Sequence, residues 1–142
     1  MHKPEEELSR AEAVTQRMLA RDAFSKLLGL EVEEVREGYC RLHFRVREDM
    51  LNGFGILHGG VTYSAADSAF AFACNSHGRL SVALSTTMEY LEAGKTGDLL
   101  TVEAQEESLK HKVGVYLIRI TNQEEKLVAL FKGTSYRTSK EI

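Results

Sequence analysis

The chain has 142 residues, a length that fits one domain with a sizeable hydrophobic core. A net charge of −3 offers no electrostatic attraction to nucleic acid or to an anionic membrane. No apolar run approaches the ~20 residues that span a bilayer, and the acidic, polar first residues do not resemble a secretory signal. We expect a cytoplasmic protein in which Cys40 and Cys74 are free thiols, with a single disulfide as the alternative.

The first part of the chain predicts a helical extension. From Glu5 to Ala20 apolar residues recur at helical spacing between charged residues. Asp22 to Leu28 continues this helix or adds a short second turn, which ends at Gly29. We therefore divide the chain into an N-terminal helical extension, residues 1–23, and a main domain, residues 24–142.

From Leu30 onward the pattern changes to that of strands. Apolar and charged residues are interleaved up to Val46, and Glu37-Gly38 marks a turn, which predicts a two-stranded hairpin. A loop with several turn signals follows from Arg47 to Leu57. The segment from His58 to about Asn75 is apolar nearly all round, so it predicts a long helix that is buried on every side.

A series of strands is predicted after this helix, whose end is marked by Gly78. The breaks at residues 94–97, 110–111 and 122–124 are interpreted as hairpin connections. One buried helix against antiparallel strands indicates the α+β class. The predicted strands are Ser81–Leu91, Leu99–Leu109, Lys112–Thr121 and Lys126–Arg137.

Asp67 is the most informative residue, because it is the only acidic residue between Met50 and Met88. It lies in the middle of the apolar helix, where a carboxylate loses hydration and is costly unless it is hydrogen-bonded or used in chemistry. The plainer interpretation is a structural acid paired with a cation that is distant in sequence. Since unpaired buried acids concentrate at functional sites, we predict a catalytic acid or base.

A glycine-rich turn, from Asn52 to His58-Gly59-Gly60, leads into this helix. Backbone N–H groups at a helix start, with no side chain in the way, can hold the negative charge that develops on an oxygen. The plainer interpretations are a tight turn for the glycines, a structural role for His58 and loop shaping for Asn52.

The spacing between the glycine turn and Asp67 also carries information. If His58 opens the helix, Asp67 lies nine residues later, about 13.5 Å along the axis and about 180° around it. Two groups so placed on one helix cannot hold the same carbonyl. We therefore expect a site that combines the glycine turn of one subunit with Asp67 of another.

The order of hairpin, glycine-rich loop, central helix and antiparallel strands resembles the hotdog fold, in which a curved sheet wraps a long helix. Within that superfamily the chain resembles the phenylacetate-degradation type of acyl-CoA thioesterase, over roughly residues 24–138. The matching residues are Asn52, Gly55, His58-Gly59-Gly60, Tyr63, Ala66 to Ala71 with Asp67, Asn75, Met88 to Leu91 and Val128 to Thr134.

The resemblance implies an enzyme that hydrolyses a coenzyme A thioester, such as phenylacetyl-CoA or a hydroxylated aryl-acyl-CoA, to free acid and CoA. Asp67 would act as general base for water or as nucleophile. Gly59 would supply the N–H that polarises the thioester carbonyl. His58 would orient the glycine turn or contact the thioester, and Asn52 would position the substrate or the water.

Further residues are expected to contact the substrate. Gly60 belongs to the turn, and Ser68 could supply a hydroxyl beside Asp67. Ser85, Thr86 and Thr87 could contact the pantetheine arm, although ordinary strand propensity explains these three equally well. The resemblance implies no metal or redox cofactor, and it implies a homodimer that assembles further into a homotetramer.

The basic tip Lys110-His111-Lys112 could meet CoA phosphates or could be a solvated turn. Cys40 with His43 and Cys74 with His77 have zinc-like spacing, but no further ligands are evident.

Two alternatives to the thioesterase remain. A related dehydratase family carries a histidine five residues after the helix aspartate, where this chain has Phe72. The other alternative is a non-catalytic acyl-CoA-binding or dimerisation module.

Overall fold

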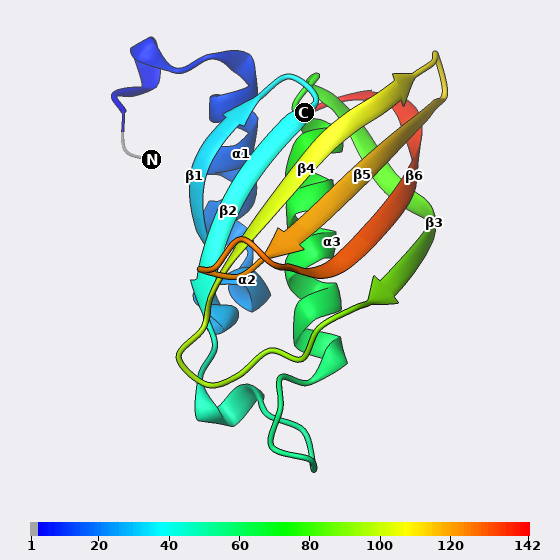
Figure 1. The fold of residues 1–142 in the computed structure, drawn as a ribbon. Coiled ribbons are helices and arrows are strands. Elements are labelled where there is room, and N and C mark those ends of the chain that lie inside the picture. Colours follow the sequence, from blue (N-terminus) through cyan, green and yellow to red (C-terminus); the bar gives the residue numbers. More distant parts are fainter. Residues whose placement is uncertain (1–2) are drawn as a thin grey trace.

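A computed structural model describes residues 3–142, and residues 1–2 of the predicted extension lie outside it (Figure 1). An antiparallel six-stranded sheet curves around one long helix, as expected for the α+β class and the hotdog fold. Within the described residues, no helix combines the length and apolarity needed to cross a bilayer.

The sheet order is β1-β2-β4-β5-β6-β3, and every neighbouring pair is antiparallel. The helices are α1 (Arg10–Arg21), α2 (Ala23–Leu28) and α3 (Gly59–Asn75), with short 3-10 turns at Glu5–Glu7 and Glu48–Met50. The strands are β1 (Glu31–Arg36), β2 (Tyr39–Arg45), β3 (Arg79–Tyr90), β4 (Leu99–Leu109), β5 (Val113–Thr121) and β6 (Leu127–Glu141).

The N-terminal helix begins at Arg10, so the predicted start at Glu5 is wrong. A capping box fixes the observed start, because the N–H of Glu12 donates to Ser9 Oγ and the N–H of Ser9 donates to the Glu12 carboxylate. The helix then packs against α3 and β1, with Ala11 buried in the shared core. The boundary between extension and main domain stays a prediction.

The connection between β3 and β4 is not a hairpin, which corrects the prediction for residues 94–97. β3 pairs with β6 at one edge of the sheet, whereas β4 lies between β2 and β5. The chain must therefore cross from the edge to the middle, and the N–H of Leu57 donates to the carbonyl of Gly94 along the way, at 2.9 Å. The breaks at 110–111 and 122–124 are confirmed as hairpin connections.

Both small and aromatic residues of the central helix α3 pack against the rest of the protein. Ala65, Ala66 and Ala69 are fully buried, which lets the sheet approach the helix closely. Phe70 packs against Tyr116 of β5 and Phe131 of β6, with ring centroids 5.6 and 5.8 Å apart. The sheet thus wraps the helix as the apolar pattern predicts.

Gly133 of β6 is required for this packing, because a Cβ there would lie 2.7 Å from the ring of Phe70. We expect Gly133→Ala to lower the free energy of unfolding by about 1–3 kcal/mol through overpacking. Gly53→Ala is the matched control, since a Cβ at Gly53 meets nothing within 4 Å. Urea unfolding at one protein concentration measures both variants, and equal stability of the two would contradict the expectation.

Candidate functional site

The glycine turn is held by the residue that precedes the helix. His58 is the N-cap of α3, and its Nδ1 accepts the N–H of Gly60 at 2.8 Å. The N–H of Gly60 is therefore engaged. Within the part of the chain that the structure describes, the N–H of Gly59 has no hydrogen-bond partner. It is the first free donor at the positive end of the α3 dipole.

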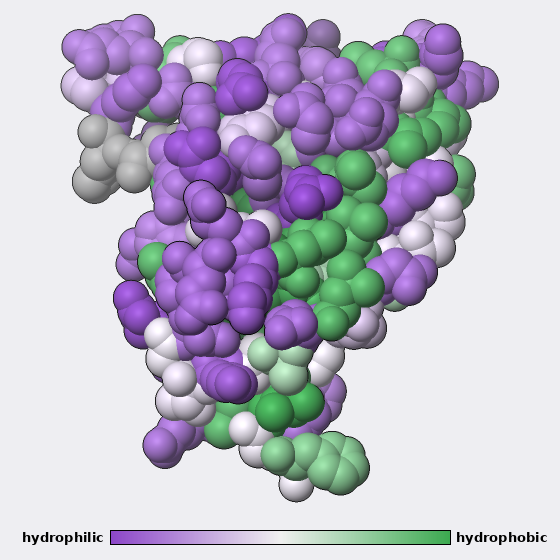
Figure 2. Space-filling view, viewed as in Figure 1, coloured by the Kyte–Doolittle hydropathy of each residue, from purple (hydrophilic) through white to green (hydrophobic). Residues whose placement is uncertain are grey.

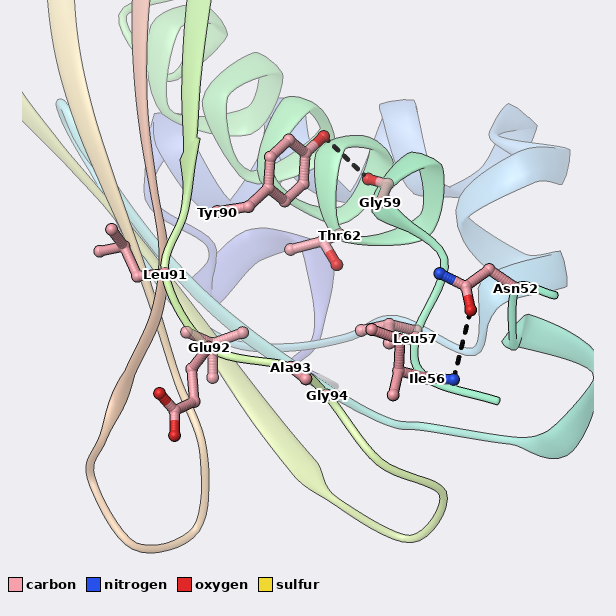
Figure 3. Close-up of a pocket in the computed structure, with 11 residues that line it drawn as sticks. Asn52, Ile56, Leu57, Gly59, Thr62, Tyr90, Leu91, Glu92, Ala93 and Gly94 are labelled. Atoms are coloured by element: carbon pink, nitrogen blue, oxygen red, sulfur yellow. Dashed lines mark hydrogen bonds between the residues drawn. The ribbon is translucent and has the colours of Figure 1, made fainter. Parts of the chain in front are cut away.

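Asn52 shapes the loop before the helix. Its side-chain oxygen accepts the N–H groups of Phe54 at 2.9 Å and Ile56 at 3.3 Å. Gly55 has a φ of 75°, which this tight turn requires. The amide nitrogen of Asn52 points away from these two donors (Figure 3). One end of the side chain thus builds the loop and the other end is available.

A pocket of about 360 Å³ lies where this loop, the start of α3 and the segment after β3 meet (Figure 3). Tyr90 closes one side, and its hydroxyl donates to the carbonyl of Gly59 at 3.1 Å. The pocket is lined by Asn52, Ile56, Leu57, Gly59, Thr62, Tyr90, Leu91, Glu92, Ala93, Gly94 and Val128.

Asp67 is half-buried on α3 and is not among the residues that line this pocket. Among the described residues its carboxylate has neither a hydrogen bond nor an ion pair. Burial raises the pKa of the Asp67 carboxyl above its usual value. Burial, with a further contribution from the Asp67 charge, raises the pKa of the Cys74 thiol to about 12. The carboxylate is therefore poorly solvated and uncompensated within one subunit.

The other predicted contact residues are distributed over two faces of α3. Ser68 faces α2, where its hydroxyl lies 2.9 Å from the hydroxyl of the buried Ser25. Thr86 of β3 is 2.6 Å from the hydroxyl of Tyr63, so β3 and α3 are joined there. Ser85 and Thr87 are exposed on β3.

Sequence reasoning missed several pocket residues. Thr62, Tyr90 and the crossing segment Leu91 to Gly94 line the pocket without having been predicted as site residues. Tyr90 could have been predicted as a site residue, because it belongs to the segment Met88 to Leu91 that resembles the thioesterase family. The crossing segment gave no signal, since Leu91 was predicted as the end of a strand and Gly94 as the start of a hairpin connection.

The residues with zinc-like spacing are engaged elsewhere. Cys40 and Cys74 are buried free thiols. His43 contacts Glu33 at 2.5 Å, and His77 contacts Glu106 at 2.7 Å. The structure therefore bears out free cysteines over a disulfide.

Residues 54–129 match the family model described as the thioesterase superfamily. The chain belongs to the thioesterase superfamily. It is therefore a thioester hydrolase. The following relatives confirm that it resembles the phenylacetate-degradation type of thioesterase, which has the hotdog fold.

The acyl-coenzyme A thioesterase PaaI of Escherichia coli K12 is 44% identical over 120 residues, which cover 84% of this chain and 86% of PaaI. A putative esterase of Archaeoglobus fulgidus is 38% identical over 92% of this chain and 85% of its own length. The solved structure of E. coli PaaI, from the phenylacetic acid degradation operon, matches with a TM-score of 0.92 and 41% identity, covering 94% of this chain and 96% of that one. A hypothetical thioesterase from Streptococcus pneumoniae, solved with coenzyme A, matches with a TM-score of 0.76 and 29% identity, covering 80% and 91%.

Proposed function

We propose that this thioesterase hydrolyses acyl-CoA to free acid and CoA, with phenylacetyl and ring-hydroxylated aryl-acyl groups as its substrates. The observation that carries the proposal is the unpaired, half-buried carboxylate of Asp67 on the same helix that presents the free N–H of Gly59. The name of the E. coli relative supports the CoA thioester, and its phenylacetic acid operon supports the aryl group.

In this proposal the charged carboxylate of Asp67 either takes a proton from water, whose oxygen attacks the carbonyl carbon, or attacks that carbon itself. In both routes the carbonyl oxygen gains negative charge, which the N–H of Gly59 stabilises. Collapse breaks the carbon–sulfur bond and releases the CoA thiolate, which takes up a proton. When Asp67 attacks first, water then cleaves the resulting anhydride. Water is the co-substrate throughout, so we propose no metal or redox cofactor.

His58 and Asn52 are proposed as positioning residues. The imidazole of His58 holds the N–H of Gly60, which fixes the peptide geometry of the turn around Gly59. The available amide nitrogen of Asn52 lies at the pocket and can donate to the substrate or to the attacking water.

We propose that the complete site forms between two subunits. Asp67 of the same chain is not among the residues that line the pocket at Gly59, which supports a carboxylate supplied by a second copy. β3 is an edge strand with exposed apolar side chains, including Val82 and Leu84, which are 51% and 62% exposed. Pairing of β3 with β3 of a second copy would satisfy this edge by two-fold symmetry.

The homotetramer is supported by the outer face of the sheet. Figure 2 shows an apolar patch over β5 and β6. On β5, Val115 and Leu117 are half-buried and alternate with buried core residues, so they face away from the core. We propose that two dimers meet through this face, and that the protein works in the cytoplasm, where the free thiols Cys40 and Cys74 would stay reduced.

Release of free thiol from a panel of acyl-CoA thioesters tests the proposed function. We expect turnover of phenylacetyl-CoA and its ring-hydroxylated relatives, with lower kcat/KM for straight-chain acyl groups. A preference for straight chains would contradict the aryl assignment but not the thioesterase. Tight acyl-CoA binding without any thiol release would favour the non-catalytic binding module instead.

A further inference from the structure

A second, basic pocket lies at the opposite end of the sheet from the glycine turn. The β4–β5 turn, the start of β3 and the end of β6 meet there, at the upper end of the molecule in Figure 1. The pocket has a volume of about 440 Å³. It is lined by Arg79, His111, Lys112, Tyr136, Arg137 and Ser139.

The two arginines of this pocket are fixed by backbone carbonyls. Arg79 Nη2 donates to the carbonyl of His111 at 2.9 Å, and Arg137 Nη1 donates to that of Lys110 at 2.7 Å. Arg137 Nε is buried and, among the described residues, has no hydrogen-bond partner. Backbone carbonyls thus hold both guanidinium groups in fixed positions at the pocket, and a guanidinium fixed in this way is suited to bind an anion.

The positive charge of this pocket is not neutralised. Among residues 3–142, neither Arg79, Arg137 nor Lys112 forms an ion pair with a carboxylate. Glu141 stands opposite Arg79 in the β3–β6 register, but it does not line the pocket and, among the described residues, forms no ion pair with Arg79. An uncompensated basic pocket on a chain of net charge −3 favours a phosphate ligand.

The position of the pocket relative to Asp67 follows from how α3 runs beside β3. Tyr63 contacts Thr86, and Asn75 accepts the N–H of Ser81 at 2.8 Å, so helix and strand run in opposite directions. Asp67 lies four residues, about 6 Å, beyond Tyr63. Asp67 therefore lies at the height of the β3 residue that comes roughly two positions before Thr86.

From this position on β3, the first residue of the strand, Arg79, is five residues away, which is about 16 Å along a strand. This span is comparable to an extended pantetheine arm. The span therefore allows a thioester beside Asp67 to reach Arg79 and Arg137 of the same subunit with the phosphates of its CoA. The exposed ring of Tyr136, on the same pocket, offers a face on which a purine can stack.

We propose that this pocket binds the phosphorylated nucleotide half of the CoA substrate. The inference rests on the proposed acyl-CoA reaction and assigns specific residues to its remote end. One subunit then supplies both Asp67 and the nucleotide pocket, while the partner supplies the N–H of Gly59. Phosphate contacts made equally before and during reaction lower KM and leave kcat unchanged.

Kinetics with two thioesters test this assignment. For Lys112→Gln and Arg137→Gln we expect KM for phenylacetyl-CoA to rise about tenfold, as for loss of one charge-assisted hydrogen bond, with kcat unchanged. KM for phenylacetyl-pantetheine, which lacks the nucleotide, should not change. The matched control is Lys126→Gln at the opposite end of β5, where Lys126 forms an ion pair with the exposed Glu124. Unchanged KM for the CoA ester, or equal increases for both esters, would overturn the proposal.

Calorimetry with adenosine 3′,5′-bisphosphate tests the pocket without any turnover. We expect binding to the wild type and to Lys126→Gln, and at least about tenfold weaker binding to Lys112→Gln. Inorganic phosphate that binds as tightly as the bisphosphate would reduce the pocket to a simple anion site and overturn the assignment. If the wild type released no thiol from any thioester, the proposed function would fail, whereas this binding measurement would still decide the pocket.

Discussion

Replacing Asp67 by asparagine is expected to lower kcat by about 10²–10⁴-fold, the range for removal of a positioned acid or base. Asparagine keeps the size and polarity of the side chain but can neither accept a proton from water nor attack the thioester carbon. We expect acyl-CoA binding and oligomeric mass to stay at wild-type values. Thiol release, calorimetry and light scattering measure these three properties. A variant that keeps wild-type turnover would rule out the catalytic role.

The pH dependence of the wild type gives an independent signature of the same carboxylate. Burial raises the pKa of Asp67, and both proposed routes need its charged form. Activity should therefore fall as the pH is lowered through a pKa above the ordinary aspartate value. The residual activity of Asp67→Asn should lack this acidic limb, because asparagine does not titrate.

Stability is expected to change in the opposite direction to activity. A carboxyl whose pKa is raised in the folded state favours its neutral form there, so it stabilises the fold below the unfolded pKa. That contribution is lost as the pH rises through the raised folded pKa. At neutral pH the charged Asp67 thus destabilises the protein, and Asp67→Asn should melt at the wild-type temperature or above it. A lower Tm would show a structural role instead.

Mixing two inactive variants should restore activity. In a two-fold dimer of Asp67→Asn with Gly59→Val, one of the two sites carries both substitutions and the other carries neither. Random assembly makes about half of the dimers mixed, so the mixture should regain about a quarter of wild-type activity. Gly59→Val is inactive in this scheme because its side chain covers the N–H that stabilises the oxyanion. Thiol release after co-expression of the two chains measures the effect.

The control for this experiment is a mixture that leaves no intact site. Asp67→Asn combined with the double variant Asp67→Asn, Gly59→Val should stay inactive, because no chain supplies the carboxylate. Activity of the first mixture no higher than that of its separate parents would show that Gly59 and Asp67 act within one subunit. That result would contradict the proposal of a site shared between subunits, but not the proposed hydrolysis of acyl-CoA.

Local patterns in the sequence predicted most elements of the fold. The apolar segment from His58 to Asn75 predicted α3, because burial on all sides leaves a signature in composition alone. The start of α1 was missed by one turn or more, since the prediction followed the helical spacing of the apolar residues and overlooked the capping box at Ser9. Strand order was not accessible in the same way. Alternation shows that a segment is a strand but not which strand pairs with it.

The same distinction separates the parts of the candidate site that the sequence suggested from those that it did not. Asp67 and the turn at Gly59 stand out because each contradicts its local surroundings in sequence. The pocket beside Gly59 depends on the crossing segment after Tyr90, which only the sheet order brings there. The basic pocket likewise needs β6 between β5 and β3, so that Arg79 and Arg137 meet the β4–β5 turn.

The strand order also has a consequence for how the chain is made. β3 is synthesised directly after α3, but its partner within the subunit is β6, which follows β4 and β5. On the ribosome, β3 and the apolar surface of α3 must therefore wait for three further strands before the sheet can close around them. Such late, long-range pairing slows folding and produces intermediates that expose hydrophobic surface and are prone to aggregate. We expect expression of this protein to depend on chaperones that bind nascent chains.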